Sequence, residues 1–134
     1  MKSRVLCVLM LASALGGVAS AHHSFAAEYD SNQPITLSGT LTKIEWTNPH
    51  GWVYIDVKGD DGKVTNWGVE FGSPNALLRR GVRRTDFPLG ISLVVKGYRA
   101  KSGSPVINGS SVKLPDGRDL YTGSSNPNAP GAEK

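Results

Sequence analysis

The feature that most constrains this chain is a series of short segments of alternating apolar residues, interrupted once by a helical pattern. The strand-like segments are residues 34–46, 52–57, 64–71, 90–100, 104–114 and 118–121. Between the third and fourth, Ser73 is a typical N-cap, Pro74 suits the first helical position, and Gly81 ends a helix predicted over 75–80. This order predicts a mainly β fold, an OB-fold-like small barrel of five to six strands with one short helix between strands three and four. A generic β-sandwich is the alternative.

Two of these segments carry further detail. In 34–46 the apolar positions change parity between Leu41 and Ile44, which predicts a bulge or bend with Gly39 as its pivot. In 64–71 the apolar positions Val69 and Phe71 share one face with Trp67. The turn at 58–63 contains an Asp-Gly pair, so the second and third segments are expected to form a hairpin.

The N-terminal residues are typical of an export signal. Lys2 and Arg4 precede a short apolar run over 5–15, and small residues end it at 18–21. We therefore expect a cleavable signal peptide at 1–21, an N-terminal arm at 22–33, the β-domain at 34–121 and a disordered tail at 122–134. The expected location is the periplasm, with no stable membrane anchor, because the apolar run is too short to span a bilayer.

Composition excludes several classes of function. The chain has 15 basic and 11 acidic residues. Loss of Lys2 and Arg4 with the signal leaves a net charge of about +2, which does not favour a nucleic-acid partner. The single cysteine, Cys7, lies in the predicted signal, so neither a disulfide framework nor a thiolate metal site is expected in the mature chain.

The three histidines predict a metal site. Cleavage after residue 21 would make His22 the first residue, so that its amine and its imidazole Nδ1 can chelate one ion. His50 would then supply a third nitrogen, and copper(II) favours such nitrogen ligands in a plane. Cleavage one residue earlier would instead create a chelate of a histidine with deprotonated backbone amides. The alternative without a metal is that His22 and His23 belong to a frayed terminus, and that His50 only completes a turn.

Aromatic residues around the Asn-Pro-His turn predict a second kind of site. Trp46 precedes the turn, while Trp52 and Tyr54 follow it on the face opposite the apolar positions of their strand. Such a face suits docking of a peptide, a glycan or a partner protein. Ordinary packing is the alternative, with Phe25 and Tyr29 of the arm covering these rings.

Glu70 falls out of phase with the apolar face of its strand, beside Asn66 and Gly68. It is expected either as an oxygen ligand or hydrogen-bond anchor, or as a solvated strand position. No nucleophile elbow, zinc-protease motif, phosphate-binding loop or carboxylate pair is present, so enzymatic activity is disfavoured. A copper-dependent oxidase is kept as a third reading.

Several short motifs together resemble a known family. They are HHSFA at 22–26, NPH at 48–50, WxVE at 67–70, SP at 73–74, and the residues Leu78, Arg80 and Gly81 that follow. This set, spread over about residues 22–115, is similar to small exported proteins of Gram-negative bacteria grouped as a domain of unknown function. The resemblance implies a periplasmic protein and supplies no activity.

The leading hypothesis is therefore a non-enzymatic periplasmic OB-like binding protein, a copper(II) carrier or chaperone. His22 would contribute its amine and imidazole, His50 the third nitrogen, and His23 or Glu70 an outer or axial contact. The alternative is a docking module for a peptide, glycan or partner protein, in which Trp46, Trp52 and Tyr54 bind the partner and no metal takes part. Trp67 and Glu70 are added to the candidate ligand-binding residues of either version.

Overall fold

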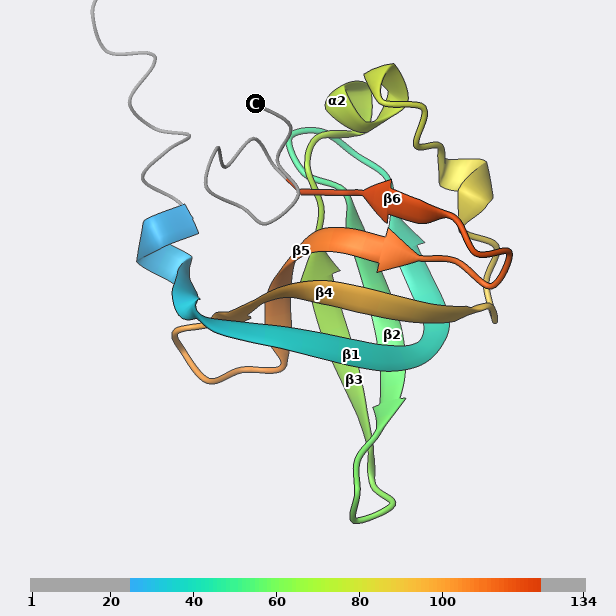
Figure 1. The fold of residues 1–134 in the computed structure, drawn as a ribbon. Coiled ribbons are helices and arrows are strands. Elements are labelled where there is room, and N and C mark those ends of the chain that lie inside the picture. The colour runs from blue at the N-terminus through green and yellow to red at the C-terminus, as the bar shows by residue number, and fades with distance from the viewer. Residues whose placement is uncertain (1–24, 124–134) are drawn as a thin grey trace, which may run out of the picture.

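The computed structural model describes residues 25–123, and it is mainly β (Figure 1). Six strands form one sheet in the order β3-β2-β1-β4-β5-β6, with neighbouring strands antiparallel. A further parallel pairing joins β3 to β5, so that the sheet closes into a ring of hydrogen-bonded strands. The strands are β1 Tyr29–Glu45, β2 Trp52–Lys58, β3 Val64–Glu70, β4 Ser92–Ala100, β5 Val106–Lys113 and β6 Asp119–Tyr121.

The predicted helix is confirmed as α2, Pro74–Arg79, between β3 and β4. The Ser73 hydroxyl accepts a hydrogen bond of 3.2 Å from the Ala76 amide, and Gly81 follows with a φ of 81°. A 3-10 helix, η1 Arg84–Asp86, and a helical stretch at 25–28 were not predicted. Within residues 25–123, no helix is long and apolar enough to cross a membrane.

The first strand differs from its prediction in two ways. It begins at Tyr29, so residues 29–33 of the predicted arm belong to β1. The predicted bulge exists, but it lies at Thr42, because Leu41 pairs with Ile55 and Lys43 with Tyr54. Gly39 is not the pivot. A Cβ there would lie 2.5 Å from the Asp56 carbonyl oxygen, so glycine permits the close approach of β1 to β2.

The inward faces of the strands fill the ring. Val53, Ile55, Val69 and Phe71 are fully buried, as their alternation predicted. Leu77 of α2 is also fully buried, and so it joins the helix to the same core. The prediction that residue 122 belongs to a disordered tail is wrong, because Thr122 is fully buried and donates its hydroxyl proton to the Gly109 carbonyl. Residues 124–134 lie outside the described part of the chain.

Gly97 lies where the backbones of β4 and β5 approach each other closely. A Cβ at Gly97 would lie 2.1 Å from the Asn108 carbonyl oxygen, whereas a Cβ at Gly68, also in a strand, would meet nothing closer than 3.5 Å. We expect Gly97→Ala to lower the free energy of unfolding by about 3 kcal/mol, because two backbones must separate. Gly68→Ala should change it by less than about 1 kcal/mol. Urea denaturation measures both, and equal effects would contradict the packing described.

Candidate functional site

Glu70 is a buried carboxylate at the end of β3. It pairs with Trp52 on β2 and with Asn108 on β5, so it lies on the outer side of the ring, away from Val69 and Phe71. Asn66 and Gly68 share its face by strand alternation, as predicted. Glu70 is nevertheless only 8% exposed. The expectation of a solvated strand position is therefore wrong, and hydrogen-bonding partners are required to hold the charge.

His50 provides one partner. The β1–β2 loop is held to the end of β3 by two backbone hydrogen bonds, from Gly51 to Gly72 at 3.0 Å and from Phe71 to Gly51 at 2.7 Å. This brings the Nδ1 atom of His50 to 3.1 Å from Glu70 Oε1 and to 3.1 Å from the Phe71 carbonyl oxygen.

These contacts select one form of the imidazole. A carboxylate oxygen and a carbonyl oxygen both only accept hydrogen bonds, so Nδ1 of His50 must carry the proton. In the neutral ring, Nε2 is then left with a free lone pair. The His50 side chain is 36% exposed, while that of Glu70 is 11% exposed. The Glu70 carboxylate therefore orients the His50 ring, as carboxylates do behind many metal-ligating histidines.

Tyr29 provides the second partner of Glu70. Its hydroxyl donates a short hydrogen bond to Glu70 Oε2, and the tyrosine is only 4% exposed. Burial raises the pKa of Tyr29 well above its ordinary range, and the Glu70 carboxylate adds to the effect. Tyr29 therefore stays protonated and remains a donor. Each carboxylate oxygen of Glu70 has its own donor, and the three side chains form a continuous Tyr29–Glu70–His50 network.

The segment before Tyr29 is fixed on the outer side of the sheet. The Phe25 ring lies 5.7 Å from the Tyr29 ring and meets Tyr98 edge-on at 5.8 Å. The Lys101 amide donates a 2.8 Å hydrogen bond to the Glu28 carbonyl. The described chain begins at Phe25, so the predicted ligands at positions 22 and 23, both histidines, lie outside the described residues. Between residues 25 and 123, no three His, Cys, Asp or Glu side chains cluster to hold a metal.

The predicted aromatic residues separate into two groups. Trp52 and Tyr54 stack on the outer face of β2, with ring centroids 6.5 Å apart, and Tyr54 donates a 3.3 Å hydrogen bond to Glu45. Trp46 does not join them, because it packs against the core with its ring 5.9 Å from Phe87. The arm does not cover this pair through any described ring contact, since Phe25 contacts Tyr29 and Tyr98 instead.

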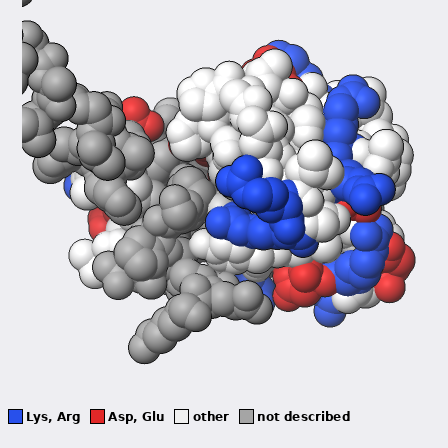
Figure 2. All heavy atoms as spheres, turned by 90° about the horizontal axis from the view of Figure 1, so that it is seen from above, with Lys and Arg blue, Asp and Glu red and all other residues white. Residues whose placement is uncertain are grey.

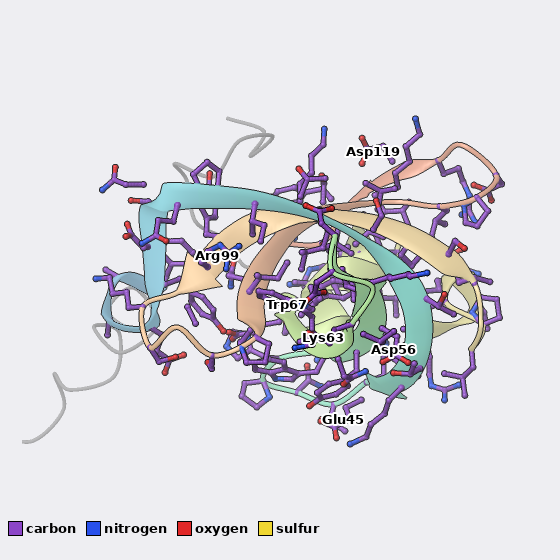
Figure 3. All side chains as sticks on the ribbon, turned by 90° about the horizontal axis from the view of Figure 1, so that it is seen from below. Glu45, Asp56, Lys63, Trp67, Arg99 and Asp119 are labelled. Carbon is purple, nitrogen blue, oxygen red and sulfur yellow. The ribbon has the colours of Figure 1, made fainter. Side chains whose placement is uncertain are left out.

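Trp67 lies on the inner side of the ring of strands and is partly buried. It packs against the core, and the Arg99 guanidinium lies 5.4 Å from its ring centroid. Seen from below, Trp67 lies within the ring of strands and Glu45 lies outside it (Figure 3). Trp67 is therefore not brought together with Glu70, although the two are only three positions apart.

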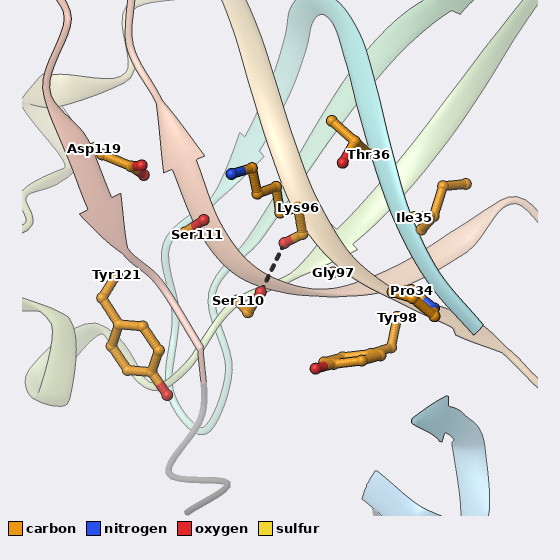
Figure 4. A pocket seen from close by; sticks show the side chains of 10 residues that line it. All are labelled: Pro34, Ile35, Thr36, Lys96, Gly97, Tyr98, Ser110, Ser111, Asp119 and Tyr121. Carbon is orange, nitrogen blue, oxygen red and sulfur yellow. Dashed lines mark hydrogen bonds between the residues drawn. The ribbon is translucent and has the colours of Figure 1, made fainter. Parts of the chain in front are cut away.

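A shallow cavity of about 640 Å³ hollows the outer face of β1, β4, β5 and β6. Tyr98 and Tyr121 stand beside it, and the Ser110 hydroxyl at its floor donates a 3.0 Å hydrogen bond to the Lys96 carbonyl (Figure 4). Tyr98 also contacts Phe25, so the cavity borders the arm. Sequence reasoning identified neither this cavity nor the role of Tyr29.

The fold and the site define a small, mainly β protein with a buried Tyr–Glu–His network on the outside of a closed ring of strands. The chain belongs to a family of unknown function, DUF6152, whose model matches residues 10–108. Membership of a family without assigned function is thus confirmed. No curated protein and no solved structure matches the chain.

Tyr29→Phe tests the network. The variant keeps the ring but removes the donor to a buried carboxylate, so we expect a loss of about 1–3 kcal/mol in the free energy of unfolding. Tyr98→Phe is the matched control, since Tyr98 is also buried and no described hydrogen bond involves its hydroxyl. Its effect should stay below about 0.5 kcal/mol. If the two variants are equally stable in urea, Tyr29 does not support Glu70 as described.

Proposed function

We propose that this chain is an exported, periplasmic copper(II)-binding protein, a carrier rather than an enzyme, built on an OB-like domain. In this proposal the signal peptide is removed before His22. The amine and Nδ1 of His22, together with Nε2 of His50, then provide three nitrogen ligands for one ion. The order of three strands, a helix and further strands in a closed ring supports the OB-like assignment.

The observation that carries the proposal is the orientation of His50. Its Nδ1 is occupied by Glu70 and the Phe71 carbonyl, which leaves Nε2 as the only ring nitrogen able to bind a metal. A carboxylate that accepts from the opposite nitrogen fixes the ring and raises its basicity as a ligand. No other described histidine exists, so a copper site at His50 needs ligands from outside residues 25–123.

The N-terminal arm supports a source for those ligands. Tyr29 is bonded to Glu70, the same residue that orients His50. Phe25 contacts Tyr29 from one helical turn earlier in the chain. Phe25 is only three positions after His22 in the sequence, a length of about 10 Å when extended. The arm is therefore anchored beside the histidine that it is proposed to complement.

The geometry changes the role expected of Glu70. Both of its oxygens already accept hydrogen bonds, one from Tyr29 and one from His50. We therefore propose Glu70 as the residue that orients His50, in place of an axial ligand. The outer or axial contact predicted for His23 remains part of the proposal. Because the site has no thiolate, it should prefer copper(II) to copper(I).

The docking hypothesis retains one specific observation. Trp52 and Tyr54 form a half-buried stack on the outer face, and the Lys43 ammonium lies 4.9 Å from the Tyr54 ring centroid. Such a stack suits a peptide, glycan or partner protein. In this alternative the histidines take no part.

The leading proposal is tested by titrating copper(II) into a chain that begins at His22. Mass spectrometry checks that N-terminus. His50→Ala should abolish the three-nitrogen electron paramagnetic resonance spectrum and weaken binding by more than about a hundredfold. Glu70→Gln should weaken copper binding by only about tenfold, because it removes the charge that contacts His50 Nδ1 and retains the proposed ligand. His22→Ala should remove the imidazole of the chelate and weaken binding as His50→Ala does.

Two controls make the outcome decisive. Trp52→Ala should leave copper affinity unchanged, whereas the docking alternative predicts that it weakens a partner without affecting any metal. A chain that begins at Ala21 should bind copper with a different spectrum, since its first residue offers no imidazole. If His22→Ala and His50→Ala both leave copper affinity unchanged, the copper site is wrong.

A further inference from the structure

One end of the molecule carries an excess of exposed positive charge. The last residue of α2 and the connection from α2 to β4 together supply four arginines, Arg79, Arg80, Arg83 and Arg84, and all four are exposed. Figure 2 looks down on this end of the molecule, where Lys and Arg side chains gather in groups. We call residues 78–89 the basic cap. The whole chain has a net charge of only +4, so this concentration is local.

The charge of the basic cap is not neutralised from within the described chain. Its one acidic residue, Asp86, is paired at 2.9 Å with Arg118, which comes from outside the cap. Arg118 also pairs with Asp116 at 2.8 Å. Across residues 25–123, no carboxylate forms an ion pair with Arg79, Arg83 or Arg84. These three guanidinium groups are therefore available to an external anion.

Arg80 differs from the other three. It donates a 2.9 Å hydrogen bond to the Gly123 carbonyl, and its guanidinium lies 4.8 Å from the Tyr121 ring centroid. These contacts hold the Arg80 side chain against residues at and just after the end of β6, which accounts for its position. The unpaired positive charge of the basic cap therefore comes from Arg79, Arg83 and Arg84.

The basic cap also exposes two large apolar side chains. Leu78 is 58% exposed and Leu89 is 63% exposed. Leu78 adjoins Arg79 at the end of α2, and Leu89 follows η1. Exposed leucines among unpaired cations are typical of surfaces that adsorb to anionic membranes, where the cations meet headgroups and the apolar groups enter the interface.

The opposite end of the molecule provides a contrast. The β2–β3 hairpin lies at the far end from α2 (Figure 1). It exposes Lys58, Lys63 and Val64, but it also exposes Asp60 and Asp61. Its charges balance, so it lacks the excess that distinguishes the basic cap.

We propose that the basic cap binds reversibly to a membrane surface rich in anionic lipid. Arg79, Arg83 and Arg84 contact the headgroups, and Leu78 and Leu89 enter the interface. The inference uses none of the residues of the proposed copper site, and so it stands or falls separately from that site. It describes a peripheral contact, which requires no membrane-spanning helix.

Vesicle co-sedimentation of the processed chain tests this proposal. Vesicles that contain phosphatidylglycerol should bind the chain, and vesicles of phosphatidylcholine alone should not. R79Q/R83Q/R84Q should lower partitioning by about a hundredfold, since each arginine near such a surface contributes about fivefold. L78S/L89S should lower it by about tenfold, because it removes only the apolar part.

The control is K58Q/K63Q/V64S, which removes two cations and one exposed apolar group from the opposite end and should leave partitioning unchanged. All substituted side chains are exposed, and circular dichroism checks that each variant is folded. Equal binding to both kinds of vesicle, or equal losses in the cap and hairpin variants, would overturn the proposal. Retained binding in L78S/L89S would also overturn it, and would indicate a surface for a soluble polyanion.

Discussion

The burial of the Glu70 carboxylate is the constraint on which the rest of the site depends. A charge at 8% exposure is costly unless hydrogen-bond donors replace the lost water. The two donors come from distant parts of the sequence, Tyr29 at the start of β1 and His50 in the β1–β2 loop. One carboxylate therefore fixes the arm and the loop to the same edge of β3. Loss of either donor would leave part of the charge without a partner.

Closure of the sheet explains why this carboxylate is buried on the outer side of the ring. The β3–β5 pairing places Asn108 beside Glu70, and Trp52 flanks it on β2. With neighbours on both strands and Tyr29 bonded to it, Glu70 has little access to water. The same closure fills the interior with apolar side chains, so chemistry is confined to the outer face and to the ends of the ring. The Tyr29–Glu70–His50 network and the basic cap occupy two such places.

Much of the fold could be predicted from the sequence, because alternation and caps act locally. Ser73 and Pro74 predicted the start of α2, and the alternation of Val53 and Ile55 predicted the inner face of β2. The bulge was predicted from a change of parity but assigned to Gly39, because local patterns do not reveal that glycine serves the approach to Asp56. Thr42 occupies the bulge.

The site was less predictable, because it depends on long-range contacts. The position of Glu70 in the alternation of β3 correctly predicted the face of the sheet on which it lies. Its burial was not predicted, because its partner Tyr29 lies 41 residues away in the sequence. The four-residue spacing of Phe25 and Tyr29 in a polar segment was the one available signal of a helical turn that docks. Trp46 was grouped with Trp52 and Tyr54 as a partner-binding residue. Its ring contacts Phe87 instead, and this contact depends on the path of a loop, which periodicity does not specify.

The most direct measurement of the central claim is the tautomer of His50, observed through the two imidazole nitrogens in a long-range nitrogen–proton correlation spectrum at a pH where the ring is neutral. The account predicts a protonated Nδ1 and a bare Nε2. It also predicts that Glu70→Gln weakens this preference. A proton on Nε2 in the unsubstituted protein would contradict the account, because the nitrogen held by Glu70 would then be the one without a hydrogen to donate.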